Sequence, residues 1–263
     1  MIIILSFLFL VGIFLGSFLN VIIDRLPNNK DIFFDRSECS FCHKKLRVFD
    51  LIPIFSFIFL KGKCRYCKKF IGWKYTLIEF VTGVLFLVAG IVLFNSSSFL
   101  NLDLTFYYKL FFYLLTASVV IVIFFTDLFY GIIPDQVLIF SLIVSLIFQI
   151  LLKVNIVFSL AGAFLSVIFF FLIYYLSKKK GMGLGDVKFS FLIGFILGPI
   201  NAFLSFYLSF LTGGIVSFIL ILWHKKKLKK DTIPFGPFLA FSLIIFLFWG
   251  DILQRIILHL LGL

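Results

Sequence analysis

Long apolar runs dominate this chain and leave few folds open to it. About 20 apolar residues in helical form cross a hydrocarbon core of about 30 Å, and the mean hydropathy of the 263 residues is +1.19. The runs that are long enough cover about residues 2–23, 77–94, 106–125, 132–152, 154–177, 200–223 and 234–262. We therefore predict an all-α polytopic membrane protein.

A shorter apolar run, about residues 187–199, gives an eighth candidate span. It ends at Gly198-Pro199, and its length suits a short, tilted or partly re-entrant helix as well as a full crossing. The first run lacks a basic leading region and a small-x-small cleavage site. We therefore expect it to be a span rather than a cleaved signal.

The basic residues are concentrated in three connections between the runs. Of the 24 Lys and Arg residues, twelve lie between Arg25 and Lys74, four between Lys178 and Lys188, and five between Lys225 and Lys230. Because short cytoplasmic loops carry the excess of Lys and Arg, we predict that all three face the cytoplasm, with eight spans and the N-terminus outside. This topology brings Asp127 and Asp186 to the cytoplasmic face.

The formal net charge of +12 also bears on partners. The excess positive charge comes from short clusters of Lys and Arg next to the spans, where anionic lipid headgroups are the simplest partner. We therefore expect contact with anionic membrane lipids and no binding of nucleic acid.

The only substantial polar segment, about residues 24–74, carries all four cysteines, as Cys39-x2-Cys42 and Cys64-x2-Cys67. Each pair can direct two thiolates at one point, and two pairs complete a closed tetrahedral zinc site, as in zinc ribbons. Disulfides are the alternative, which a reducing cytoplasm disfavours. We predict a small zinc-ribbon-like lobe between the first two spans, folded largely by its metal. The apolar stretch Leu51–Leu60 is too short to cross, so it would pack on the membrane surface or beneath the lobe.

Two carboxylates, Asp127 and Asp186, stand at predicted span ends. A carboxylate next to hydrocarbon is costly unless it is paired, neutralised or in contact with water, so it is by default a functional candidate. The alternative is a snorkelling or helix-capping residue, and Asp135, after Pro134, fits a cap or a charge that favours the helix dipole. Asp127 fits that alternative less well, because a helix C-terminus disfavours negative charge.

Asp186 follows three glycines, Gly181, Gly183 and Gly185. Without a Cβ atom these residues permit close backbone approach and an extended break at membrane depth. We expect an extended glycine-rich segment here that could hold an unwound substrate through main-chain hydrogen bonds.

The chain resembles a known family in these and several further motifs. The further motifs are Gly16-Ser-Phe-Leu-Asn20 running to Arg25-Leu-Pro27, Gly62-Lys-Cys64, Lys74-Tyr75 with Leu77-Ile78-Glu79, and Ile233-Pro-Phe-Gly-Pro-Phe-Leu-Ala240. With them, nearly the whole chain resembles the type IV prepilin peptidases, which are bifunctional leader peptidases and N-methyltransferases. Two departures are Thr76 where Pro is usual and Asp24 before Arg25.

The resemblance implies a GxGD-type membrane aspartic protease of the bacterial inner membrane. Asp127 and Asp186 would be its catalytic pair. The residues implied to support this pair are Gly183, Gly185, Lys188, Pro134 and Asp135. Residues 106–263 would form the peptidase domain.

The resemblance also implies a second activity on the same substrates. The family cleaves prepilin or pseudopilin precursors and methylates the new N-terminus with S-adenosylmethionine, and residues 1–105 would carry this second activity. Gly62 and Glu79 match family positions there. Glu79 has an alternative role, which is to pair with a Lys at the start of the second span.

Three other functions remain open at this point. The chain could be a peptidase without methylation, or a zinc-stabilised membrane scaffold in which both aspartates are caps. An ion-coupled transporter would usually show inverted repeats and carboxylates at the bilayer midplane, and the sequence shows neither.

Overall fold

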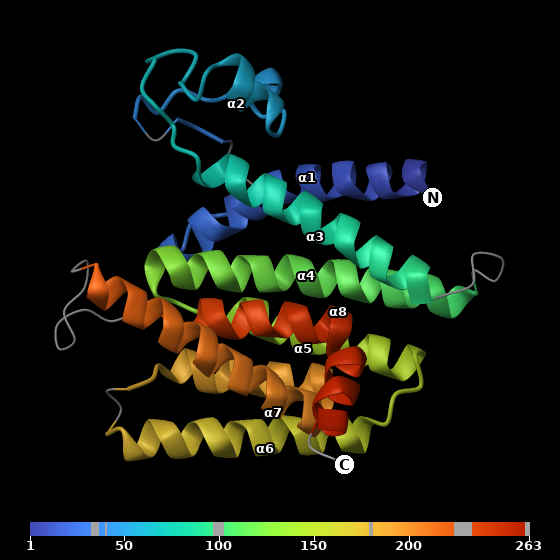
Figure 1. Ribbon diagram of the computed structural model, residues 1–263. Coiled ribbons are helices and arrows are strands. Elements are labelled where there is room, and N and C mark those ends of the chain that lie inside the picture. The colour runs from blue at the N-terminus through green and yellow to red at the C-terminus, as the bar shows by residue number, and fades with distance from the viewer. Residues whose placement is uncertain (33–36, 40, 97–102, 179–180, 224–232, 261–263) are drawn as a thin grey trace. The chain divides into compact units, whose positions relative to one another are not determined.

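The structure is a computed structural model that describes residues 1–32, 37–39, 41–96, 103–178, 181–223 and 233–260. Helices joined by short connections make up most of it (Figure 1). In chain order the elements are α1 (Ile2–Arg25), η1 (Leu26–Asn28), η2 (Val48–Asp50), α2 (Phe55–Phe59), α3 (Lys74–Ser96), α4 (Leu104–Tyr130), α5 (Asp135–Leu151), α6 (Ile156–Leu176), α7 (Leu184–Leu222) and α8 (Gly236–Leu260). No strand forms among the described residues, and the predicted all-α fold class is confirmed.

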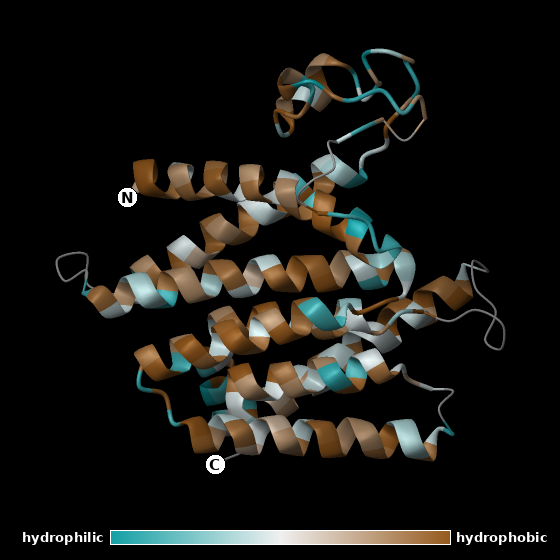
Figure 2. Cartoon of the chain, turned by 180° about the vertical axis from the view of Figure 1, so that it is seen from behind, coloured by the Kyte–Doolittle hydropathy of each residue, from teal (hydrophilic) through white to brown (hydrophobic). Residues whose placement is uncertain are grey.

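Six helices in the described part of the chain are long and apolar enough to cross a membrane: α1, α3, α4, α6, α7 and α8. Helix α5 is also apolar but has only 17 residues. Hydrophobic residues, coloured brown, make up most of the length of these helices in Figure 2. The chain is therefore a multi-pass membrane protein.

Helix α7 is two helices joined at a break. Gly198 has φ 72° and ψ 176°, and Pro199, which cannot donate a backbone hydrogen bond, follows it. Both halves of α7 pack against α6. In the half before the break, Phe191 packs against Phe164 of α6, with ring centroids 5.9 Å apart. In the half after the break, Phe206 packs against Phe170 of α6, with ring centroids 4.7 Å apart. Phe164 and Phe170 lie less than two turns apart, so the chain folds back at Gly198. The predicted runs 187–199 and 200–223 therefore occupy separate halves of α7.

By internal contacts the chain divides into two compact units, residues 1–122 and 123–263. In the first unit α1 packs on α3 through small residues. A Cβ at Gly12 would lie 2.8 Å from the Cα of Gly83, and a Cβ at Gly16 would lie 2.8 Å from the Cα of Glu79. Glycines at such positions let two membrane helices approach backbone to backbone, which is how helices associate in lipid.

A polar cluster joins the C-terminal end of α1 to the N-terminal end of α3. Asp24 of α1 accepts hydrogen bonds from Nζ of Lys74 and from the hydroxyl of Tyr75, both at 2.8 Å. The side-chain amide of Asn20 donates to the carbonyl oxygen of Tyr75 at 3.0 Å. These bonds fix the point where the polar segment leaves α1 and returns to α3.

In the second unit α7 is the central helix. A Cβ at Gly162 of α6 would lie 2.5 Å from the carbonyl oxygen of Gly194 of α7. The hydroxyls of Ser209 of α7 and Ser242 of α8 lie 2.6 Å apart. Gln149 of α5 donates to the carbonyl oxygen of Phe195 at 2.6 Å. Close glycine contacts and buried hydrogen bonds thus hold three helices against α7.

Several residues used in the topology prediction lie outside the described part of the structure. They are Arg36, Lys179, Lys180 and the whole cluster Lys225–Lys230. The side of the membrane that each loop faces therefore stays a prediction.

Candidate active site and metal centre

Asp127 and Asp186 come from different helices of the second unit and line the same cavity, which has a volume of about 610 Å³. Asp127 lies in the last turn of α4 and Asp186 in the first turn of α7, and the two residues are 6% and 7% exposed. The structure thus brings together the two carboxyls that the sequence singled out.

The chain turns sharply after Asp127. The N–H of Gly131 donates to the carbonyl oxygen of Asp127 at 2.9 Å, and Gly131 has φ +66°, the left-handed conformation that commonly ends a helix at glycine. The Oδ2 atom of Asp127 is buried without a hydrogen-bond partner among the described residues. Such an atom costs about 1–3 kcal/mol when no partner is supplied.

Asp186 caps its own helix as well as lining the cavity. Its Oδ2 accepts a hydrogen bond from the N–H of Gly183 at 3.1 Å, and Gly183 is the N-cap of α7. The capping interpretation of Asp186 is therefore correct, and it is compatible with a place in the cavity. The prediction of an extended glycine-rich segment is wrong for Gly185, which lies inside α7. The helix begins at Leu184 because the Asp186 cap stabilises its first turn.

Two glycines allow close approach at this site. A Cβ at Gly185 would lie 3.2 Å from the Cβ of Ile133, in the connection between α4 and α5. A Cβ at Gly236, at the start of α8, would lie 2.5 Å from Oδ2 of Asp127. Gly236 was not among the predicted site residues. Its place in the Ile233–Ala240 motif was the signal that could have found it.

Of the remaining support residues, Lys188 and Asp135 line the cavity, and Pro134 is not among its lining residues. Nζ of Lys188 donates to both carboxylate oxygens of Asp135 at 2.8 Å, and both side chains are more than half exposed. Asp135 is not a cap, but it lies in the first turn of α5, where its charge favours the helix dipole, which was the other expectation. Pro134 is the N-cap of α5, without a side-chain hydrogen bond, and the Asp135 carboxylate turns to Lys188.

The four cysteines come together in the first unit as predicted. Their sulfur atoms all lie within 4.8 Å of one another, and Sγ of Cys39 is 3.9 Å from Sγ of Cys67. The two pairs fold alike: His43 donates its N–H to the carbonyl oxygen of Cys39, and Lys68 donates to that of Cys64. Tetrahedral thiolates about 2.3 Å from zinc stand roughly 3.8 Å apart, so this set of sulfurs fits the metal.

The ionisation of the thiols suits a bound cation. Burial raises the pKa of Cys39, but hydrogen bonds from the backbone of Phe41 and Cys42 outweigh it and lower that pKa to about 7. At Cys42 the backbone of Lys44 lowers the pKa, but burial and the other three thiols raise it to about 11. Beside a neighbouring thiolate, the Cys42 thiol keeps its proton until a cation compensates the charge.

The two methyltransferase candidates both have clear packing partners. Gly62 has φ +70°, and a Cβ there would lie 2.7 Å from the ring of Phe70. Oε2 of Glu79, whose side chain is buried, accepts the N–H of Ile54 at 2.8 Å. The predicted alternative for Glu79, a pair with a Lys at the start of the span, is wrong, because Lys74 binds Asp24 instead.

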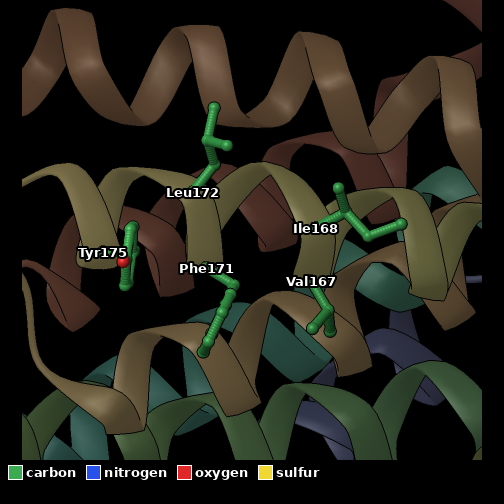
Figure 3. A pocket seen from close by; sticks show the side chains of 5 residues that line it. All are labelled: Val167, Ile168, Phe171, Leu172 and Tyr175. Carbon is green, nitrogen blue, oxygen red and sulfur yellow. The ribbon is translucent and has the colours of Figure 1, made fainter.

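A separate hollow on α6, of about 250 Å³, contrasts with this site (Figure 3). All of its lining side chains come from that one helix, and all are aliphatic or aromatic: Val167, Ile168, Phe171, Leu172 and Tyr175. It has no carboxylate or thiol, and its composition is that of a lipid-facing surface.

Comparison with known proteins agrees with this geometry. Residues 10–93 match the model of the bacterial peptidase A24 N-terminal domain, and residues 114–218 match that of the type IV leader peptidase family. A prepilin leader peptidase/N-methyltransferase of Bacillus subtilis (strain 168) is 33% identical, over 94% of this chain and 95% of the relative. Proteins with the same name from Legionella pneumophila and Aeromonas salmonicida are 31% and 30% identical, and more than nine-tenths of each chain is covered. No solved structure matches. The chain belongs to the type IV leader peptidase family.

Proposed function

We propose that this protein removes the leader peptide from type IV prepilins or pseudopilins and then methylates the new N-terminus. The proposed peptidase activity rests on one observation. Two buried carboxyls, Asp127 and Asp186, line a single cavity at the ends of two membrane helices. A prepilin presents its scissile bond at such a height, because its leader is polar and the following segment is a membrane helix. The names of the relatives support both activities.

In the proposed mechanism the two carboxyls share one proton, since both cannot ionise readily at close range. The ionised one takes a proton from water as the water oxygen attacks the scissile carbonyl carbon. The protonated one gives its proton to the carbonyl oxygen. When the C–N bond breaks, the amine leaves with a proton returned from the pair. The unpartnered Oδ2 of Asp127 is a suitable atom to hold this proton.

The other residues of the cavity position this pair. Gly183 fixes the Asp186 carboxyl through its N–H, and Gly185 and Gly236 keep neighbouring backbone close to the carboxyls. The Lys188–Asp135 pair, which also lines the cavity, joins α7 to the start of α5. Fixed geometry of this kind matters because small misplacements of reacting groups are costly in rate.

We assign methyl transfer to residues 1–105 and the peptidase to residues 106–263. S-adenosylmethionine is the proposed methyl donor, and it is consumed as a substrate. Zinc held by Cys39, Cys42, Cys64 and Cys67 is proposed to stabilise the lobe, since four protein thiolates leave no open position for catalysis. The proposed location is the bacterial inner membrane, with the lobe and both aspartates on the cytoplasmic side.

The test is leader removal from a prepilin by membranes that contain the full-length protein. Asp127→Asn and Asp186→Asn are each expected to lower the rate by at least about 10²-fold. Asp251→Asn changes an exposed carboxylate of α8 and is expected to leave the rate unchanged. Normal cleavage by either active-site variant, at equal membrane content, would contradict the proposal and favour the scaffold.

A further inference from the structure

The short helix α2 of the cysteine lobe exposes an apolar face. Phe55, Ile58 and Phe59 are 56%, 63% and 82% exposed, and their spacing places them on one side of the helix. On the other side Phe57 packs against Trp73, with ring centroids 4.8 Å apart. Val48 and Phe49 of the neighbouring η2 are 79% and 73% exposed. A contiguous apolar patch of this kind is typical of an interaction surface.

A strained turn fixes the entry to α2. Ile54 has φ +61° and ψ −51°, a rare conformation for a β-branched residue, and the N–H of Phe55 donates to the carbonyl oxygen of Pro53 at 2.6 Å, which closes a γ-turn. Such strain persists only where surrounding groups impose it. Here the buried carboxylate of Glu79 imposes it by accepting the N–H of Ile54.

This contact fixes the depth of α2 relative to the membrane. Helix α3 begins at Lys74, so Glu79 lies about 7.5 Å along its axis, at 1.5 Å per residue. The turn at Ile54 therefore docks beside the second turn of a membrane-spanning helix and not beyond its end. In Figure 2 the short helix of the lobe is largely hydrophobic, and its loops mix hydrophilic and hydrophobic stretches.

Basic side chains follow directly after the apolar face. Lys61, Lys63, Lys68 and Lys69 are all exposed. Aromatic and aliphatic side chains on one face with lysines beside them are the composition of a segment that lies in the interface of an anionic bilayer. The two ends of the lobe are also the ends of membrane helices α1 and α3, which holds this face near the lipid surface.

We propose that this face, made by Val48, Phe49, Phe55, Ile58 and Phe59, inserts into the cytoplasmic leaflet and that the adjacent lysines contact anionic lipid headgroups. Glu79 is then a positioning residue, which holds the lobe on the bilayer through Ile54. The anchor is independent of the peptidase chemistry. It would keep the lobe at the height where a cleaved prepilin, still embedded by its helix, presents its new N-terminus.

The test is fluorescence quenching on the full-length protein in liposomes that contain phosphatidylglycerol. Phe59→Trp is made in a background without other tryptophans (Trp73→Phe, Trp223→Phe and Trp249→Phe). Its emission is expected to be quenched by lipids brominated near the headgroup end of the acyl chain and shielded from aqueous iodide. Phe41→Trp, in the first cysteine turn, is the matched control and is expected to be quenched by iodide.

Equal iodide quenching of the two variants, with no effect of brominated lipid on Phe59→Trp, would overturn the proposal and indicate a protein-binding face. Replacing phosphatidylglycerol with phosphatidylcholine is expected to increase iodide quenching of Phe59→Trp, and no change would overturn the role of the lysines.

The role of Glu79 is tested by a second substitution in the Phe59→Trp protein. Glu79→Leu should expose the tryptophan to iodide, whereas Glu79→Gln, which keeps an acceptor for the N–H of Ile54, should leave it shielded. Full shielding with Glu79→Leu would overturn the positioning role.

Discussion

Gly236 is the residue whose side-chain size should matter most for the aspartate pair. A Cβ there would lie 2.5 Å from Oδ2 of Asp127, closer than unbonded atoms can stand, so Gly236→Ala must displace the carboxyl. We expect leader removal to slow by about 10²-fold, with the protein still inserted, since Ala suits the first turn of α8. The measurement is the initial rate of cleavage in membranes with matched protein content.

Gly214→Ala is the control for this prediction. Gly214 also lies in a membrane helix, and a Cβ there would meet nothing within 4 Å. It is expected to keep the full rate. Equal rates for the two variants would show that the space around Asp127 is not critical.

The Lys188–Asp135 pair should contribute little to stability despite its short bonds. Both side chains are more than half exposed, and exposed ion pairs are worth about 0–1 kcal/mol. Lys188→Gln is therefore expected to change the free energy of unfolding by less than about 1 kcal/mol, measured by denaturation in detergent. A much larger loss would mean that the pair is shielded from water in the membrane.

Some of these residues could be predicted from the sequence and others could not. Asp127 and Asp186 stood out because carboxylates are rare beside apolar runs, and the cysteines because of their spacing. Gly236 and Ile54 owe their importance to contacts between distant segments, with Asp127 and with Glu79. Local sequence does not reveal such contacts, and the same holds for the hydrogen bonds of Asp24 with Lys74 and Tyr75.

Among the elements, the cysteine lobe gives the clearest test. Cys39→Ser combined with Cys64→Ser removes one ligand from each pair, so we expect bound zinc, measured by elemental analysis of the purified protein, to be lost. The lobe should then be destabilised, and methylation should fall before cleavage does. His43→Ala changes an exposed neighbour of Cys42 that binds Glu38 and is expected to retain the metal.

Full zinc content in the double cysteine variant would refute the assigned ligands. Equal loss of methylation and cleavage would show that the lobe supports both activities, against the division into two functional parts.

The helices themselves were largely predictable, because length and apolar character decide which segments can cross a membrane. Each of the eight predicted runs falls on a helix. The fold-back of α7 was signalled by Gly198-Pro199. The glycine-rich stretch before Asp186 was harder to interpret, since glycine is compatible both with an extended segment and with a helix start, and a side-chain cap decided between them.

At the scale of the whole molecule, the charge pattern predicts a single topology. An epitope tag at the N-terminus should be accessible from outside intact spheroplasts, and a tag inserted after Lys30 should be accessible only after permeabilisation. If the N-terminal tag is protected in intact spheroplasts, the topology is the reverse of the predicted one. Both aspartates would then lie at the outer face, where a prepilin leader does not lie.

The most direct test of the central claim is the intact mass of a prepilin after incubation with the full-length protein, with and without S-adenosylmethionine. We expect loss of the leader in both samples and the added mass of one methyl group only when the donor is present. Neither product should form with Asp127→Asn or Asp186→Asn, because methylation requires the newly freed amine. A leader removed normally by either variant would contradict the account.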